Sequence, residues 1–437
     1  MRRGIQVRQL ILTASAFVIA GARPAHAQGS ALVPGDSGLQ SLVAEALARN
    51  PTVAQRQEAV RAATLRIRPA GSLPDPMLTV GVMDLVLPHF DFNQTDFTEA
   101  DLELSQEIPW PGALGARSGV MRAAAAGARA EEGTVRRDVT TAMAVAYYRL
   151  GYAVTALETL RHQRELLEAA VQLSTTRYAT GAAPQSDPLQ AKLARDRLRS
   201  EEFVLESDRI AALAAVNALR NHAPGDSVPV TSIDPAALRA GVAPQPPADS
   251  LVALALATHP RLAARRAAVD AATRSIQVER LGARPDFTLS ARYGYRPVAF
   301  GFKFPDFFSA FVGVRLPIWA WRKQNRLADA ARADSTGAAA GLRDAELQLS
   351  REVSEVAARV QAAQQRLVLL VDGVLPNARG TVESVLRSYQ VGRAEFLTLL
   401  SVEDARYRAE LEAVAVAADY QAQLVMLRQL TAGETQP

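Results

Sequence analysis

"DLELSQEIPWPGALGAR", residues 101–117, joins two different patterns in one short stretch. Its first half alternates between apolar and charged residues, which predicts a strand with one polar face. Pro109, Trp110, Pro111 and Gly112 follow, and no further proline occurs before Pro184. A helix over residues 113–178 would be roughly 100 Å long at 1.5 Å per residue. The sequence therefore predicts a short strand joined directly to a very long helix.

The chain repeats this layout once. "SLVAEALARNP" at 41–51 matches "SLVALALATHP" at 250–260, and the Pro-Asp pair at 74–75 matches the one at 285–286. "IPWPG" at 108–112 pairs with "LPIWA" at 316–320, and "RYATGA" at 177–182 pairs with "SYQVGR" at 388–393. Four landmarks in the same order at a nearly constant offset predict a duplicated unit.

Each half predicts the same elements: a helix, two strands, a very long helix, a tight turn and a return helix. The first helices are expected over 39–67 and 251–281, each interrupted at an Asn-Pro or His-Pro pair. The long hairpins are expected over 113–178 with 187–219, and over 322–389 with 396–430, where Pro376 should kink or break the outgoing helix. Residues 402, 405, 409, 413, 416, 420, 424 and 427 form a coiled-coil seam in the last helix. The opposite helix faces are also rich in alanine, which predicts packing on two sides.

The predicted organisation has five parts. Residues 1–27 combine arginines, a short apolar run and an Ala-His-Ala site, as a secretory signal peptide does. The run is shorter than the roughly 20 residues of a membrane-spanning helix. A first repeat (28–222), a Pro/Gly-rich linker (223–249), a second repeat (250–432) and a tail (433–437) follow.

Four segments alternate as strands: 77–88, 97–109, 286–297 and 307–319. The second has apolar Ala100, Leu102 and Leu104 on one face and Glu99, Asp101, Glu103, Ser105 and Glu107 on the other. Arg292 and Arg315 lie on the polar faces of the third and fourth. The alternation fits a membrane β-barrel with a watery interior, but equally a soluble sheet with one wet face. Four strands are too few for such a barrel, so membrane strands would require several chains to close it.

Several function classes are disfavoured by the composition. The chain has no cysteine, and its five histidines are scattered without a metal-ligand partner three or four residues away. It contains no phosphate loop or nucleophile elbow, so we expect no enzyme, metal site or cofactor. The small positive charge comes almost entirely from arginine and is not clustered with aromatic residues, so nucleic acid is not an expected partner.

"LPDPMLTVGV", "LSQEIPWPGALGAR", "RYATGAAPQSDPL", "YQVGRAEFLTLL" and the duplicated layout resemble the TolC family, the outer-membrane factors of tripartite efflux pumps. The segment "SQEIPWPG" is most similar to the heavy-metal branch, the CzcC- and CusC-like proteins. The resemblance implies a homotrimer in which each chain gives four strands to one outer-membrane barrel, continued by a helical coiled-coil barrel in the periplasm. It also implies passive conduction, with a periplasmic adaptor (membrane fusion protein) and an inner-membrane RND transporter as partners.

The resemblance assigns roles to particular residues. Pro109, Trp110, Pro111 and Gly112 would be the joint between strand and tunnel helix, with Trp110, Trp319 and Trp321 near the membrane interface. The barrel lumen would be lined by Glu99, Asp101, Glu103, Glu107, Arg292 and Arg315. The periplasmic tips that meet the adaptor would be Tyr178, Thr180, Gly181, Ala182, Tyr389, Val391, Gly392 and Arg393. The gate would comprise Asp187, Tyr389, Arg393 and Glu395, held closed by polar contacts between helices.

This chain departs from the family pattern in two places. Members of the copper-exporting type often carry a lipidated cysteine, which this chain lacks, so we expect no lipid anchor. Many members have aspartates six and nine residues beyond the second tip glycine, where this chain has Thr398 and Ser401. Heavy-metal cations are the expected cargo. The alternatives are an exit duct for drugs or type I secreted proteins and, in another class, a soluble periplasmic coiled-coil scaffold.

Overall fold

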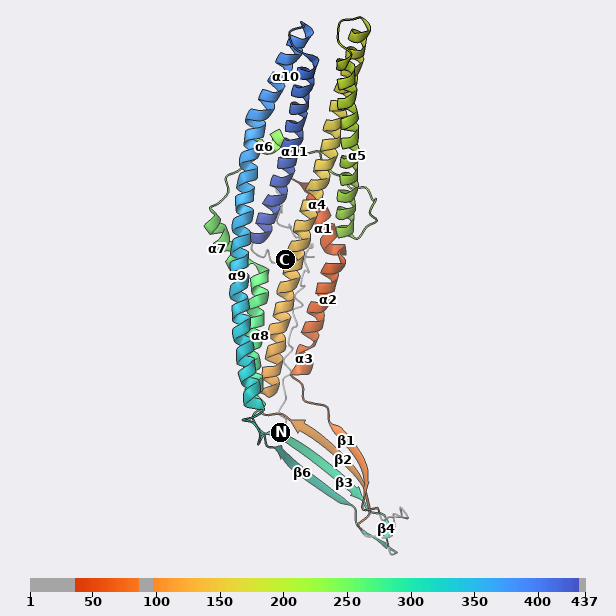
Figure 1. Ribbon diagram of the computed structural model, residues 1–437. Helices are drawn as coiled ribbons and strands as arrows, with labels where there is room; N and C mark the ends of the chain where they lie inside the picture. Colours follow the sequence, from red (N-terminus) through yellow and green to blue (C-terminus); the bar gives the residue numbers. More distant parts are fainter. Residues whose placement is uncertain (1–35, 86–96, 300, 432–437) are drawn as a thin grey trace, which may run out of the picture.

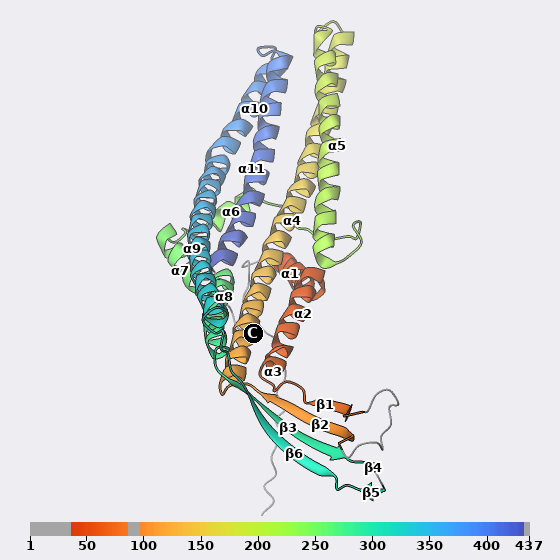
Figure 2. The same cartoon turned by 60° about the horizontal axis from the view of Figure 1, so that its bottom comes forward.

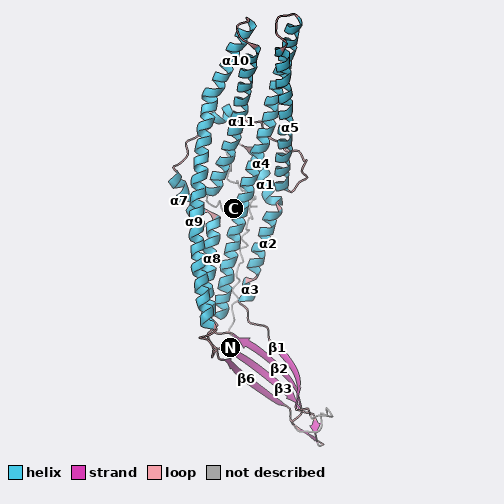
Figure 3. Cartoon of the chain, in the orientation of Figure 1, coloured by secondary structure: helices cyan, strands magenta, loops and turns pink. Residues whose placement is uncertain are grey.

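The computed structural model describes residues 36–85, 97–299 and 301–431, so the predicted signal peptide and tail lie outside the described residues. The molecule is elongated, with long helices at one end and a small sheet at the other (Figure 1). All four longer strands gather at the end opposite the helical tips (Figure 3). None of the described helices is long and apolar enough to cross a membrane.

Two long helical hairpins form most of the molecule. The first consists of α4 (Ala113–Ala179), an unbroken helix of 67 residues, and α5 (Ser186–Arg220). The second consists of α9 (Gln324–Leu369), a π-helical turn η1 (Leu370–Val374), α10 (Leu375–Gln390) and α11 (Phe396–Thr431). The predicted interruption at Pro376 is confirmed: the π turn ends just before it, and Pro376 lies in the first turn of α10, where a missing N–H is tolerated.

Shorter helices precede each strand pair. They are α1 (Ser37–Arg49), α2 (Pro51–Leu65) and α3 (Ile67–Ala70) in the first half, and α7 (Ala248–Thr258) and α8 (Pro260–Leu281) in the second. The predicted breaks are confirmed at Asn50 and His259, whose backbones are extended. The Asn50 carboxamide accepts from the Thr52 N–H at 2.9 Å, and Nδ1 of His259 accepts from the Arg261 N–H at 3.1 Å. Each residue therefore ends one helix and caps the next.

The core runs along the helices and is contacted by α11 on two sides. Ala413, Val416 and Tyr420 belong to the cluster of the second half, whereas Ala418 and Val425 belong to that of the first. The predicted packing on two sides is thus confirmed for α11. Most of the predicted seam is at least partly buried, but Ala405 is exposed.

The four longer strands form one antiparallel sheet in the order β1, β2, β3, β6. They are β1 (Met77–Met83), β2 (Glu99–Ile108), β3 (Asp286–Tyr295) and β6 (Phe307–Arg315). The sheet is curved and carries β1 and β6 at its edges (Figure 2). A short hairpin of β4 (Val298–Ala299) and β5 (Phe302–Lys303), which the sequence did not predict, extends β3 away from the helices.

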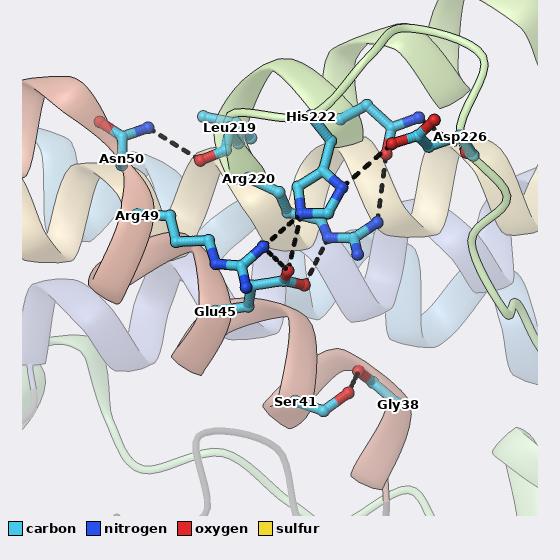
Figure 4. A network of polar contacts seen from close by, with 10 residues as sticks. Gly38, Ser41, Glu45, Arg49, Asn50, Leu219, Arg220, His222 and Asp226 are labelled. Atoms are coloured by element: carbon cyan, nitrogen blue, oxygen red, sulfur yellow. Dashed lines mark hydrogen bonds and ion pairs between the residues drawn. The ribbon is translucent and has the colours of Figure 1, made fainter.

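The segment between the halves is tied to both. It contains the unpredicted helix α6 (Pro235–Ala240), whose Arg239 donates to one Asp372 oxygen of the π turn at 3.0 and 2.8 Å. At the end of α5, Arg220 donates to Glu45 of α1 at 2.6 Å, and His222 contacts both Glu45 and Asp226 (Figure 4).

Two histidines correct one expectation from the sequence. His222 has an acidic neighbour four residues later, Asp226, at 3.1 Å from Nδ1, and His162 has Glu165 three residues later, at 3.6 Å. Arg49 and Arg220 lie on the same carboxylate, Glu45, so the group is an ion-pair network between α1 and α5 (Figure 4). Among the described residues, no group of His, Asp and Glu side chains could hold a metal ion.

Candidate functional site

The sheet has one charged face, built by strands that are distant in sequence. Glu103 of β2 lies opposite Arg292 of β3 in register, and their charged ends are 2.9 Å apart. Arg315 of β6 contacts both Glu107, at 2.9 Å, and Asp286. Acidic β2 thus faces arginines on β3 and β6. The sequence placed these acids and arginines on one face, and the strand register confirms it.

The polar face is the better covered of the two. Glu99 and Asp101 are only 9 % and 8 % exposed, whereas Leu102 and Leu104 on the opposite face are 46 % and 51 % exposed. The exposed apolar face continues over the other strands with Leu78, Val80, Leu289, Tyr293, Phe308, Val312 and Val314. An exposed apolar face of this size needs a lipid or protein partner.

The joint between β2 and α4 is four residues long. β2 ends at Ile108 and α4 begins at Ala113, and Gly112 between them has φ +89°. The Trp110 N–H donates to Asp286 Oδ1 at 2.9 Å, and its ring stacks on Phe287 at 6.1 Å. The start of β3 therefore fixes the place where β2 becomes α4. In the second half, Trp319 and Trp321 are both exposed.

The two hairpin tips are closed by the same backbone turn. Gly181 has φ +73° and its N–H donates to the Tyr178 carbonyl at 3.0 Å; Gly392 has φ +75° and its N–H donates to the Tyr389 carbonyl at 3.0 Å. A left-handed residue after a helix favours glycine, which has no Cβ to clash. Thr180, Ala182, Val391 and Arg393 flank these glycines, and all four are exposed.

The two tip tyrosines have diverged. Tyr178 is 45 % exposed, whereas Tyr389 is 5 % exposed and packs against Phe396, with ring centroids 5.7 Å apart. The guanidinium of Arg177, on the other hairpin, lies 4.9 Å from the centroid of the Tyr389 ring. Arg177 stands within the motif "RYATGA", but no local pattern marks it as a tip contact, because only the fold brings it to the second tip.

The expected polar contact between Asp187 and Tyr389 is not formed in this chain. Asp187 lies in the first turn of α5 and accepts from the Ser186 hydroxyl at 3.3 Å. The Tyr389 hydroxyl is buried and has no hydrogen-bond partner among the described residues. Arg393 and Glu395 are exposed. Within one chain, the hairpins therefore meet through the face of the tyrosine ring and not through its hydroxyl.

A cavity of about 730 Å³ lies midway along the helices, between α4, α5 and α11. His259 at its border is 3 % exposed. Burial lowers the pKa of His259 to about 4, and the positive charges of Arg137 and Arg261 act in the same direction. His259 is therefore a neutral structural cap at physiological pH.

Comparison with known proteins places this architecture. Residues 42–222 and 251–433 both match the family model described as outer membrane efflux protein. The chain belongs to the outer membrane efflux protein family. The two matches within one chain agree with the internal duplication, and the resemblance to TolC-family outer-membrane factors is confirmed. A comparison with curated protein sequences found no match.

Solved structures of outer-membrane channels share the fold of this efflux protein over nearly its whole length. CusC gives a TM-score of 0.78 at 15 % identity, covering 91 % of this chain and 93 % of that one. VceC from Vibrio cholerae gives a TM-score of 0.73 at 20 % identity, covering 90 % of this chain and 96 % of that one. The open state of MtrE from Neisseria gonorrhoeae gives a TM-score of 0.74 at 17 % identity, covering 92 % of this chain and 91 % of that one. The fold class predicted from the sequence, mainly helical with a small β part and an internal repeat, is confirmed.

The family is one of transport proteins, not enzymes, and its members are outer-membrane channels. The protein is accordingly an outer-membrane efflux channel.

Proposed function

We propose that three copies of this chain form one closed β-barrel in the outer membrane, continued by a helical tunnel in the periplasm. The four-stranded sheet carries the proposal. Among the described residues, its edges, β1 and β6, each have a strand neighbour on only one side, and its apolar face is exposed. Backbone groups in a bilayer must all be paired, which strands from neighbouring chains would achieve by closing the sheet.

The charged face would then line the lumen. Glu99, Asp101, Glu103 and Glu107, with Arg292 and Arg315 opposite them, would form rings repeated in three chains. Trp319 and Trp321, which are exposed between β6 and α9, fit the membrane interface, where Trp is favoured. The channel conducts passively in this proposal, because no described group suggests that it hydrolyses anything.

The tips would meet a periplasmic adaptor, which links the channel to a proton-driven RND pump in the inner membrane. One observation and one physical argument support this assignment. The glycine turns are exposed and lie farthest from the sheet (Figure 1). A glycine without a side chain also lets another backbone approach closely. Asp187, Tyr389, Arg393 and Glu395 remain the proposed gate region.

Heavy-metal cations are the proposed cargo. The support is the "SQEIPWPG" segment and the acidic lumen face, since rings of carboxylates favour cations. The alternative, a duct for drugs or type I secreted proteins, would use the same fold. The predicted signal peptide, domain boundaries and unlipidated N-terminus also remain proposals, which N-terminal sequencing and mass spectrometry of the membrane protein would test.

The experiment is a deletion strain complemented with wild-type protein or an empty vector. We expect the wild type to restore resistance to divalent heavy-metal ions and to appear in detergent-extracted outer membranes. Restored resistance to drugs only would favour the alternative cargo. Recovery in the soluble periplasmic fraction would instead support the coiled-coil scaffold.

A further inference from the structure

A cation over an aromatic ring joins the two hairpin ends. Arg177 near the end of α4 lies over the face of Tyr389 near the end of α10, 4.9 Å from the ring centroid. The ring also packs against Phe396, with ring centroids 5.7 Å apart, and it shares a small apolar cluster with Ala191 of α5. Tyr389 thus lies between the two hairpins and not on the surface of its own.

The duplicated sequence offers this contact in one direction: an arginine from the first repeat meets a tyrosine from the second. The first repeat has Arg177-Tyr178 where the second has Ser388-Tyr389. Tyr178 is 45 % exposed, and the residue directly before Tyr389 is a serine, not an arginine. The arginine of the first repeat therefore meets the tyrosine of the second, so the contact joins the halves instead of stabilising each one separately.

Both partners are held by the glycine turns. The Ala182 N–H donates to the Arg177 carbonyl at 2.8 Å, and the Gly392 N–H donates to the Tyr389 carbonyl at 3.0 Å. The turns depend on left-handed backbone at Gly181 and Gly392. Any distortion of either turn therefore moves the residue whose side chain makes the contact.

We propose that Arg177 is a positioning residue that latches the first hairpin to the second through the Tyr389 ring, and that the glycine turns are the release. A protein that docks on the exposed turns would act on the latch through these two backbone hydrogen bonds. This inference rests on the proposed function of the tips, and it adds the residue and the contact through which docking would open them. A cation over a desolvated ring is held by the ring face, so the hydroxyl is not required.

The test compares four variants as purified channels in planar bilayers. Arg177→Ala and Tyr389→Leu remove the contact, and we expect the open probability to rise at least fivefold, the factor that corresponds to about 1 kcal/mol. Tyr389→Phe keeps the ring, and it should match the wild type. Arg195→Ala is the control, because this arginine on α5 pairs with the adjacent Asp196 at 2.7 Å. The latch is wrong if Arg177→Ala stays as closed as the wild type. A Tyr389→Phe channel as leaky as Tyr389→Leu would show that the hydroxyl holds the tip.

Coupling between turn and latch is tested by Gly181→Ala. We expect it to raise the open probability in the wild-type background and to add nothing in Arg177→Ala. Equal effects in both backgrounds would contradict the coupling.

A cross-link separates failure of the latch from failure of the proposed function. The natural chain has no cysteine, so Arg177→Cys with Tyr389→Cys can be bridged specifically by a reducible bifunctional thiosulfonate. We expect the bridged protein to lose export and to regain it on reduction. Normal export by the bridged protein would overturn the latch and leave the channel function intact. If even the unmodified wild type neither conducts nor exports, the proposed function fails; efficient bridging in that protein would then show only that the contact is structural.

Discussion

Arg292 and Glu103 lie opposite each other on neighbouring strands, and their charged ends are 2.9 Å apart. Their strands come from different repeats, so the pair joins the two halves on the charged face of the sheet. Arg315 of β6 reaches across β3 to Glu107 of β2, at 2.9 Å, and this pair also joins the two halves. Three of the four acidic side chains that β2 brings to this face therefore have an arginine partner within the chain, since Arg296 also lies 3.8 Å from Glu99.

This compensation predicts a channel with only weak cation preference. Replacing Glu99, Asp101, Glu103 and Glu107 by Gln or Asn should shift the reversal potential in a potassium chloride gradient toward anion preference, because the arginines remain. Arg292→Gln should shift it the opposite way. Equal permeability to potassium and chloride in the wild type, unchanged by the acid substitutions, would refute the assignment of this face to the lumen.

Gly112 is predicted to be the sensitive position of the joint. Its φ of +89° is unfavourable for a residue with a Cβ, so Gly112→Ala should destabilise the assembly by roughly 1–2 kcal/mol per chain. Gly115→Ala is the matched control, because Gly115 lies in the first turn of α4 with open space around it, so the alanine variant should be at least as stable as the wild type. The measurement is thermal unfolding followed by circular dichroism. A Gly112→Ala protein as stable as the wild type would contradict this account of the joint.

His259 predicts a loss of stability in acid. Its pKa is about 4 in the folded chain against an ordinary value of 6.5, so the unfolded chain binds more protons between these values. Stability should therefore fall as the pH drops from about 6.5 to about 4, by on the order of 3 kcal/mol in total. His259→Asn copies the cap that Asn50 provides in the first repeat and removes the titrating group.

The measurement compares the melting temperatures of wild type and His259→Asn at pH 7.5 and pH 4.5. The melting temperature of the variant should fall less than that of the wild type between pH 7.5 and pH 4.5. An identical loss in both proteins would show that other groups carry the acid sensitivity.

The tip glycines are predicted to be needed for export but not for assembly. Replacing Gly181 or Gly392 by a bulky residue such as Leu should abolish metal resistance, because left-handed backbone and close approach are both lost. Trimer abundance in the outer membrane, measured by immunoblot without heating, should be unchanged. Normal resistance would make the tip an ordinary turn, and absence of the trimer would make the defect one of folding.

Much of this architecture follows from local sequence signals. Pro51 and Pro260 marked helix breaks, and Pro376 marked the change from α9 to α10, because proline restricts the backbone wherever it stands. The alternation around Asp101 and Leu102 assigned both sheet faces correctly, because strand side chains alternate with period two. The absence of proline between Ala113 and Pro184 predicted the length of α4.

Other features could not be predicted, because they depend on which elements become neighbours. Helix α6 is too short for a periodic signal, and its Arg239 has meaning only beside Asp372. Arg177 lies more than two hundred residues from Tyr389, and no local pattern pairs them. The same limit produced the expected contact between Asp187 and Tyr389, which the single chain does not form. The alternation of apolar and polar residues also predicts which sheet face is apolar, but not whether lipid or protein covers that face.

The most direct test of the account is the mass and conductance of the detergent-purified protein. We predict a particle with three chains by light scattering corrected for detergent, and discrete conductance steps when it is inserted into planar bilayers. A monomeric particle that produces no steps, although it was extracted from outer membranes, would contradict the closed three-chain channel.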